Sequence, residues 1–548
     1  MAESKMNTKV VKIKRPELRR YLVPINTSTS QQMFADCLVI GSGIAGLRAA
    51  IEAASNGCEV ILVCKKNLSD SNTWNAQGGI ASVLAGDDSI QSHIKDTLNT
   101  GCGICNNETV EQVVADGPGL VKELLEWGAE FDKNSSGSIS VSFEGGHSHA
   151  RVAHAHGDNT GRAIAEAMIN KVRNFENITI IENFFAVDLI TNEAGVCIGL
   201  IGKNSRSTTE IIWAKTVILA SGGAGRLYRE TTNPDIATGD GLAMAARAGA
   251  ILRDMEFMQF HPTTLYIAGA SRALITETLR GEGAILVDIN HKAFMAEYHK
   301  NAELAPRDVV SRAILDQMLK TGSTHVYLDV RHFKKDYFAK RFPFINELLV
   351  SFDIDISKDL IPVRPSAHYM IGGVKTDNQA RSNIQNLFAC GEAASTGLHG
   401  ANRLGSNSLL EGLVFGRISG RNAAAIAKKT SKIQGPAKFK YDIPQSDRSR
   451  LDTEDILNSL RSLMWRNVGI TRSARPLSEA QEIISFWQRY VLDKIFDSPI
   501  GWECQNMLTV SLMMAKAAEA RTESRGVHFR SDYPQADDTK FKTHLEFE

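Results

Sequence analysis

Apolar and polar positions follow the pattern of a strand, a helix and a second strand early in the chain. The apolar run 37–40 has the length of a buried parallel strand. Residues 44–56 are rich in Ala, Leu and Ile and are followed by Gly57, a residue type that commonly ends helices. Residues 59–64 predict the second strand. This order predicts a Rossmann-type βαβ unit, the start of a parallel sheet.

Similar periodicities continue along the chain. Helices are predicted over 107–132, 162–172, 453–465, 477–495 and 503–522, with further helices starting near Asp240 and Ser408, and strands over 179–191, 195–201, 215–225 and 386–392. The strand at 215–225 ends in a glycine turn. The alternation of the two element types is typical of an α/β fold.

Composition divides the chain into four parts. Residues 36–255 and 365–435 carry the pattern of one nucleotide-binding domain. Between them, residues 256–364 hold more charge and more aromatic residues, which predicts an inserted α+β capping domain with two crossings that could act as hinges. Residues 440–548 predict a C-terminal helical domain. Residues 1–35 are basic and lack the apolar core of a secretory signal. Glu3 and Glu17 count against the alternative of an organelle presequence, so we interpret these residues as a mobile extension.

The turn after the first strand carries a G-x-G-x-x-G motif, formed by Gly41, Gly43 and Gly46. The first glycine permits a tight turn, the second lets backbone approach a pyrophosphate, and the third lets the helix pack on the strand. The second strand ends in Cys64, Lys65 and Lys66 and lacks the acidic residue that holds an NAD ribose. This absence favours a flavin over a plain NAD site.

Composition argues against a nucleic-acid-binding, membrane-spanning or disulfide-bonded protein. The chain has 548 residues and balanced charge, 62 basic against 62 acidic, which gives no sign of attraction to nucleic acid or membranes. No apolar run reaches the roughly 18 residues of a membrane span. Eight cysteines in so long a chain predict a reducing, cytoplasmic location without a disulfide framework. We interpret Cys102 and Cys105 as loop cysteines, since no second pair completes a zinc site.

Three arginines and two histidines lie in glycine-rich stretches after residue 255. They are Arg280, Arg307, Arg403, His261 and His368. Arginines usually lie on solvated faces, but neighbouring glycines indicate a backbone that approaches a ligand closely. Each arginine–carboxylate contact contributes roughly 1.5 to 3 kcal/mol. The sequence therefore predicts a pocket for a small dicarboxylate.

A polar stretch from Glu144 to Gly161 contains His147, His149, His154 and His156. No carboxylate or cysteine completes a metal-ligand set at helical spacing, so we predict no metal site here. Hydrogen bonding within a polar loop is the preferred interpretation.

Several long motifs, in this order, resemble the succinate dehydrogenase and fumarate reductase flavoprotein family and, within it, the aspartate-oxidising branch. They are SGIAGLRAA, AQGGIA, EGGHSH, FMQFHPTTL, TETLRGEGA, APRDVVSRAI, AHYMIGGV, HGANRLGSNSLLEG and ESRGVHFRSDYP, spread over residues 35–535. Succinate dehydrogenases attach FAD to a histidine at the position of Asn72, which implies non-covalent FAD in this chain. Glu144 stands where the membrane enzymes have a glutamine-containing loop, and a carboxylate there suits a substrate with an ammonium group.

The resemblance implies roles for individual residues. FAD would be held by Gly41, Ser42, Gly43, Ile44, Ala45 and Gly46, by Lys65, by Asn72, Thr73, Trp74, Asn75, Ala76, Gln77, Gly78 and Gly79, and by Asp240, Glu392, Ser408 and Leu409. The substrate would be held by His261, Thr276, His368 and Arg403, with Gln259, Glu277 and Arg280 nearby. The helix near Ser408 would point its positive end at the flavin. Arg307 matches the family's proton-transferring arginine, but because arginine stays protonated we expect it mainly to orient and stabilise charge.

The implied activity is FAD-dependent oxidation of L-aspartate to iminoaspartate, the first step of de novo NAD biosynthesis. O₂ or fumarate would reoxidise the FAD, and quinolinate synthase would receive the product. Two alternatives stay open: a soluble fumarate reductase, and a non-catalytic flavoprotein subunit that docks partners through its C-terminal helices.

Overall fold

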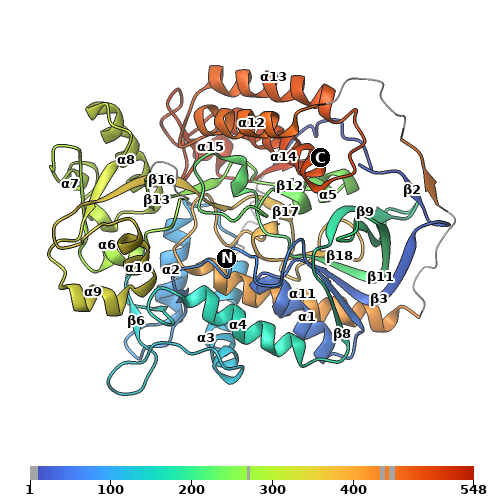
Figure 1. Ribbon diagram of the computed structural model, residues 1–548, viewed down its shortest axis with the longest axis horizontal. Helices are drawn as coiled ribbons and strands as arrows, with labels where there is room; N and C mark the ends of the chain where they lie inside the picture. The colour runs from blue at the N-terminus through green and yellow to red at the C-terminus, as the bar shows by residue number, and fades with distance from the viewer. Residues whose placement is uncertain (1–9, 268–271, 432–438, 444–450) are drawn as a thin grey trace, which may run out of the picture.

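The computed structural model describes residues 10–267, 272–431, 439–443 and 451–548, and the sheet with the most strands in this part of the chain has seven and lies at the right of Figure 1. The strand order is β8-β4-β3-β11-β10-β9, and β18 pairs with β11. The strands are β3 (Gln31–Ile40), β4 (Val60–Val63), β8 (Ile178–Ile181), β9 (Phe185–Thr191), β10 (Cys197–Lys203), β11 (Thr209–Leu219) and β18 (Leu387–Ala389). Strands β8, β4, β3, β11 and β18 pair in parallel, whereas β10 and β9 add an antiparallel edge.

The βαβ unit predicted from the sequence is confirmed. Strand β3 ends at Ile40, α1 covers Ile44–Ser55, and β4 lies parallel to β3. All four residues of β4 are buried, as expected for a strand covered on both faces. The glycine loop is therefore placed at the carboxyl end of a central strand.

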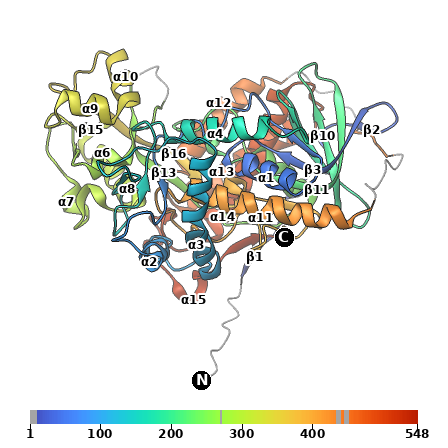
Figure 2. The ribbon, with the colours of Figure 1, turned by 90° about the horizontal axis from the view of Figure 1, so that it is seen from below.

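Helices α1 and α11 (Asn407–Lys429) lie side by side across this sheet (Figures 1 and 2). A Cβ on Gly416 would lie 2.6 Å from the Ala45 carbonyl oxygen, and one on Gly420 would lie 2.4 Å from the Ala49 carbonyl oxygen. Gly412 likewise leaves no room for a side chain beside Ile44. This stripe of glycines at every fourth position lets the two helices pack closely, with both amino termini at the same cavity.

The segment between the two parts of the sheet domain forms a separate lobe, drawn in yellow-green at the left of Figure 1. Its strands are β13 (Met258–Leu265), β14 (Ile285–Val287), β15 (Val326–Asp329) and β16 (Ile361–Met370), and its helices are α6 (Glu277–Gly281), α7 (Met295–Tyr298), α8 (Arg307–Thr321), α9 (Lys335–Arg341) and α10 (Pro343–Ser351). Its buried apolar residues, from Leu265 to Val363, form their own cluster. The boundaries 256–364 stay a prediction.

The remaining elements are short strands and the helices of the first half and the C-terminal part. The helices are α2 (Ile90–Thr100), α3 (Asn107–Glu126), α4 (Thr160–Arg173), α5 (Asp240–Ala248), α12 (Thr453–Asn467), α13 (Ala474–Val491), α14 (Pro499–Ala520) and α15 (Asp538–Phe541). The strands are β1 (Val11–Ile13), β2 (Ile25–Asn26), β5 (Ile80–Ala81), β6 (Val141–Ser142), β7 (Val152–Ala153), β12 (Leu252–Arg253), β17 (Gly373–Lys375), β19 (Ala394–Ser395), β20 (Lys440–Tyr441), β21 (Thr471–Arg472), β22 (Phe529–Arg530) and β23 (Leu545–Phe547). Within the described ranges, no helix is long and apolar enough to cross a membrane.

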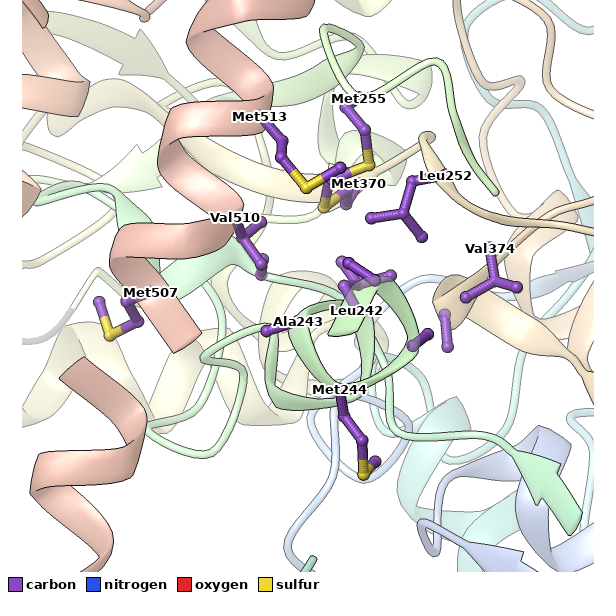
Figure 3. Packing of buried hydrophobic residues seen from close by; sticks show 14 of the residues in the cluster. Leu242, Ala243, Met244, Leu252, Met255, Met370, Val374, Met507, Val510 and Met513 are labelled. Atoms are coloured by element: carbon purple, nitrogen blue, oxygen red, sulfur yellow. The ribbon is translucent and has the colours of Figure 1, made fainter. Parts of the chain in front are cut away.

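The C-terminal helices share the core of the sheet domain. Figure 3 shows Val510 and Met513 of α14 beside Leu242 of α5 and Met255, all members of one buried cluster. The end of the chain is also not purely helical as predicted, because β23 pairs with β1 and β12. The helical part is thus continuous with the nucleotide-binding core and is not packed on its own.

The prediction of a mobile extension is wrong for residues 10–35; residues 1–9 lie outside the described part. Strand β1 pairs with β23, and Leu22 and Ile25 are buried in a cluster with Trp502. Arg15 donates to the carbonyl oxygens of Ala246 and Ala250, both at 2.8 Å, near the C-terminus of α5. Local composition gave no sign of these distant partners.

Two predicted elements also differ from the structure. The strand predicted over 179–191 is divided into β8 and β9 because Asn183 adopts a left-handed conformation, with φ 55°. The helix predicted over 107–132 ends at Glu126, shortly before Gly128 with φ 96°.

An aspartate of the sheet domain caps a helix of the lobe. The Asp158 carboxylate accepts hydrogen bonds from the backbone N–H groups of Phe344 (3.0 Å) and Ile345 (2.9 Å) in the first turn of α10. The side chain is buried, and burial raises the pKa of Asp158 to about 6. The folded chain therefore holds this proton more tightly than the unfolded chain.

Asp158 should give the free energy of unfolding a pH dependence of predictable sign. Its stabilising contribution is complete below about pH 4 and is lost as the pH rises through about 6. When the pH is lowered from about 8 to about 5, the free energy of unfolding of the wild type should rise by about 1 kcal/mol relative to that of Asp158→Asn, because asparagine does not titrate. Denaturant titration of both proteins at each pH measures this, and a constant difference would contradict it.

Candidate active site

A cavity of about 1180 Å³ lies beyond the carboxyl ends of β3, β4, β11 and β18. This is where open α/β sheets commonly bind ligands. The predicted cofactor residues that line it are Gly41, Ser42, Gly43, Ile44, Ala45, Lys65, Asn72, Thr73, Trp74, Asn75, Ala76, Gln77, Asp240, Glu392, Ser408 and Leu409. His368 and Arg403 of the predicted substrate set line it as well. One continuous space therefore joins the two sets.

The glycine loop has the shape that a pyrophosphate needs. Gly41 has φ 112°, and a Cβ there would lie 2.2 Å from the Ala220 carbonyl oxygen. A Cβ on Gly46 would lie 1.9 Å from the Gly41 carbonyl oxygen. A Cβ on Gly43 would meet only Thr73 Oγ1, at 3.5 Å, in a residue that lines the cavity. The first and third glycines serve packing, whereas the second leaves a cradle open toward the cavity.

Two helix amino termini meet this space, and neither is capped by the side chain of its own N-cap residue, although Thr73 Oγ1 accepts from the Ile44 backbone N–H of α1 at 3.0 Å. Helix α1 begins after Gly43, and α11 begins after Ser406, which has φ 62°. Uncapped N–H groups and the positive end of a helix favour phosphates and anionic ring edges. Gln77 Oε1 and Ser221 Oγ are buried at the cavity without a hydrogen-bond partner in the described chain. These features fit FAD.

Polar side chains also connect across the cavity wall. Glu392 accepts from Asn72 Nδ2 (3.1 Å) and from the Met370 backbone N–H (2.9 Å), and burial raises the pKa of Glu392 to about 7. Lys65 Nζ contacts Asp240 Oδ2 at 2.8 Å. The amide at position 72 cannot bond covalently to a flavin, which fits non-covalent attachment.

Next to the cavity, arginines and carboxylates form a buried cluster. Arg307 Nε donates to Glu277 Oε2 at 2.6 Å, and Arg307 Nη1 donates to Gln259 Oε1 at 3.3 Å. Arg403 Nε donates to the same Gln259 oxygen at 3.1 Å. Although burial alone would raise it, Arg307 and Arg280 hold the pKa of Glu277 below its usual range. Gln259 thus fixes two guanidiniums side by side.

Glu144 points into this cluster. Its carboxylate accepts from Ser406 Oγ at 2.7 Å and from Thr278 Oγ1 at 3.4 Å. A Cβ on Gly405 would lie 2.9 Å from Glu144 Oε2, 3.2 Å from Arg307 Nη2 and 3.6 Å from Glu277 Oε2. Burial, and then the neighbouring Glu277, raise the pKa of Glu144. The three charged groups converge on the space that Gly405 leaves free.

The two predicted histidines lie beside each other, and of the two His368 lines the cavity. The rings of His261 and His368 lie 5.2 Å apart between centroids. Burial, followed by the charges of Arg307 and Arg403 respectively, holds both pKa values well below the usual range. His368 Nδ1 lies 2.9 Å from Thr232 Oγ1. Both rings are therefore neutral near pH 7.

Some predicted site residues lie outside the cavity wall. Gly79 packs against the Ala153 carbonyl, Gly46 packs against Gly41, and Gly78 faces Glu144. Arg280 lies behind the cluster, with Nη2 3.4 Å from Glu277 Oε1, and Thr276 precedes Glu277 at the start of α6. These residues support the site from behind.

The histidine-rich loop is held by hydrogen bonds, as predicted. His147 Nε2 lies 3.1 Å from the Gly405 carbonyl oxygen, and His154 Nε2 lies 2.7 Å from Ser142 Oγ.

The thiols of Cys102 and Cys105 are protonated. Burial raises the pKa of the Cys102 thiol to about 11 and that of Cys105 to about 12. The described residues contain no group of ligands arranged for a metal ion.

Sequence reasoning missed several residues that hold the site together. The Tyr369 ring lies against Arg403, Glu411 accepts from Tyr369 Oη, and Ser406 donates to Glu144. A signal was present for one feature: the glycines of α11 recur every four residues, which indicates close helix packing. The hydrogen-bond partners of Glu411 had no local signal, because they come from two other stretches of the chain, one with Tyr369 and one with Thr396 and His399.

Comparison with known proteins gives two family matches. The family described as "FAD binding domain" matches residues 36–409, and "Fumarate reductase flavoprotein C-term" matches residues 457–547. The L-aspartate oxidase of Streptomyces coelicolor is 40% identical over 93% of this chain and 91% of its own length. That of Yersinia pestis is 40% identical over 92% of this chain and 97% of its own length.

Solved structures are similar over nearly the whole chain. An E. coli quinol fumarate reductase superimposes with a TM-score of 0.87 at 34% identity, covering 94% of this chain and 95% of that one. Mycobacterium smegmatis Sdh1 gives a TM-score of 0.79 at 33% identity, covering 92% and 90%. Adenylylsulfate reductase of Archaeoglobus fulgidus, at 18% identity over 97% of this chain and 96% of that one and a TM-score of 0.74, shares the fold alone.

Proposed function

The chain belongs to the L-aspartate oxidase family of FAD-binding flavoproteins, and from this premise we propose that its arginine and carboxylate cluster is the aspartate site. It is an FAD-dependent oxidoreductase that converts L-aspartate to iminoaspartate, the first step of de novo NAD biosynthesis.

The observation that carries the assignment of the site is the position of Glu144. Its carboxylate shares one small space with Arg307 and Glu277, beside the cavity that fits FAD. Succinate and fumarate offer only carboxylates, which arginines can bind. Aspartate adds an ammonium group, and a buried carboxylate is the group that pairs with it.

Each group of the chain then has a role. Arg403, with His368, binds one substrate carboxylate at the cavity wall, and Arg307 orients and neutralises the other. Oxidation requires a neutral amine, so the ammonium group must lose a proton. Glu144 accepts this proton in our proposal, and the pKa of its carboxyl, raised by burial, suits a proton acceptor. FAD, when bound, supplies the two-electron acceptor.

Anaerobic mixing of the purified holoprotein with L-aspartate tests this function. The flavin absorbance should bleach with L-aspartate and recover when fumarate or O₂ is added. Bleaching with succinate but not with aspartate would identify a soluble fumarate reductase instead. A holoprotein that responds to neither acid would support a non-catalytic docking subunit.

The wider context is part of the same proposal. We infer that O₂ and fumarate are both usable acceptors and that the unstable imine passes to quinolinate synthase. Balanced charge and the absence of a disulfide framework support a cytoplasmic location.

A further inference from the structure

A tyrosine ring supports the substrate-facing arginine. Tyr369 follows His368 on β16, and Arg403 Cζ lies 4.4 Å from the centroid of its ring. Both residues line the cavity. A guanidinium over an aromatic face is attracted to it, and more strongly where water is excluded. Arg403 therefore lies on a fixed aromatic platform.

A buried carboxylate holds this platform. Glu411 of α11 is 1% exposed. Its Oε2 accepts from Tyr369 Oη and from His399 Nε2, both at 2.9 Å, and its Oε1 accepts from Thr396 Oγ1 at 2.6 Å. Although burial opposes ionisation, His399 and these donors hold the pKa of Glu411 below its usual range. A full negative charge thus lies behind the tyrosine.

His399 borders a second, very small space. This cavity of about 10 Å³ is also lined by Asp254, Ser395 and Glu411. The buried His399 Nδ1 has no hydrogen-bond partner within the described ranges. A space of this size, with polar walls, accommodates about one water molecule. Such a water would satisfy Nδ1 and fix the ring that binds Glu411.

We propose that Tyr369, held by Glu411 and His399, is a positioning residue that orients Arg403 toward a substrate carboxylate. A phenol that donates to a carboxylate gains electron density in its ring, which strengthens the attraction to the guanidinium. Arg403 Nε and Nη1 are occupied by Gln259 and Ser408. In the part of the chain that the structure describes, Nη2 makes no hydrogen bond. The platform therefore aims the remaining donor.

This role rests on the proposed function and predicts an effect on affinity. Interactions that bind ground state and transition state alike change KM and leave kcat unaltered. Tyr369→Phe keeps the ring but loses the hydrogen bond to Glu411, and should weaken succinate binding to the holoprotein about fivefold. Tyr369→Leu removes the ring and should weaken it about fiftyfold, with kcat for L-aspartate within about twofold of wild type. Isothermal titration calorimetry with succinate and steady-state kinetics measure the two quantities.

Tyr228→Phe is the matched control. Tyr228 is buried, and its hydroxyl donates to the Val468 carbonyl oxygen at 3.0 Å. The Tyr228→Phe variant therefore loses a buried tyrosine hydrogen bond outside the cluster. It should bind succinate like wild type, whereas Glu411→Gln should resemble Tyr369→Phe. Wild-type affinity in Tyr369→Leu, or a loss in Tyr228→Phe equal to that in Tyr369→Phe, would overturn the positioning role. Absence of flavin bleaching when wild-type holoprotein is mixed with L-aspartate would refute the proposed function and this inference with it.

Discussion

Replacing Glu144 by glutamine should lower kcat/KM for L-aspartate about a hundredfold while changing succinate affinity less than about threefold. Glutamine has the same size and still accepts from Ser406, so the variant removes charge and little else. Losing one partner of a buried charge pair costs about 2 to 5 kcal/mol, and a hundredfold change corresponds to about 2.7 kcal/mol. Succinate has no ammonium group and does not use this charge.

The measurement is steady-state kinetics with L-aspartate beside calorimetry with succinate on the same holoprotein. Glu282→Gln is the control, because it removes a carboxylate that binds Arg341 at 2.8 Å outside the cluster. It should leave both quantities near wild type. Equal losses for both acids in Glu144→Gln would mean that Glu144 supports the fold of the pocket and does not select the amino group.

The features that the sequence predicted correctly are local ones. The turn at Gly41, Gly43 and Gly46 requires backbone geometry within six residues, so its motif can be read directly. The placement of Arg307 and Arg403 depended on long family motifs, because spacing alone does not bring residues 96 positions apart to one glutamine.

The features that were missed depend on pairings between distant segments. Glu411 meets Tyr369 across 42 positions, and Asp158 meets Phe344 across 186. Strand β1 finds its partner only at the other end of the chain, so its basic residues resembled a free tail. A pattern within one window records local conformation and amphipathicity but not which elements pack together.

Replacing Gly43 by alanine should raise the dissociation constant of FAD about a hundredfold or more while the apoprotein stays folded. The added methyl group meets no protein atom closer than 3.5 Å and projects where phosphate oxygens must approach the backbone. The loss is therefore expected in cofactor affinity and not in the free energy of unfolding. Fluorescence titration of apoprotein with FAD measures the affinity, and thermal unfolding of the apoprotein measures the fold.

Gly119→Ala is the matched control, because it adds the same methyl group to a helix position with no atom within 4 Å. Alanine in a helix interior should stabilise the protein by roughly 0.5 to 1 kcal/mol and leave FAD affinity unchanged. If the Gly43→Ala apoprotein were unfolded, Gly43 would be needed for the fold, as Gly46 is, where a Cβ would lie 1.9 Å from the Gly41 carbonyl oxygen. If Gly43→Ala bound FAD as tightly as wild type does, the pyrophosphate would not lie at this loop. The cavity beyond β3 would then hold a different ligand.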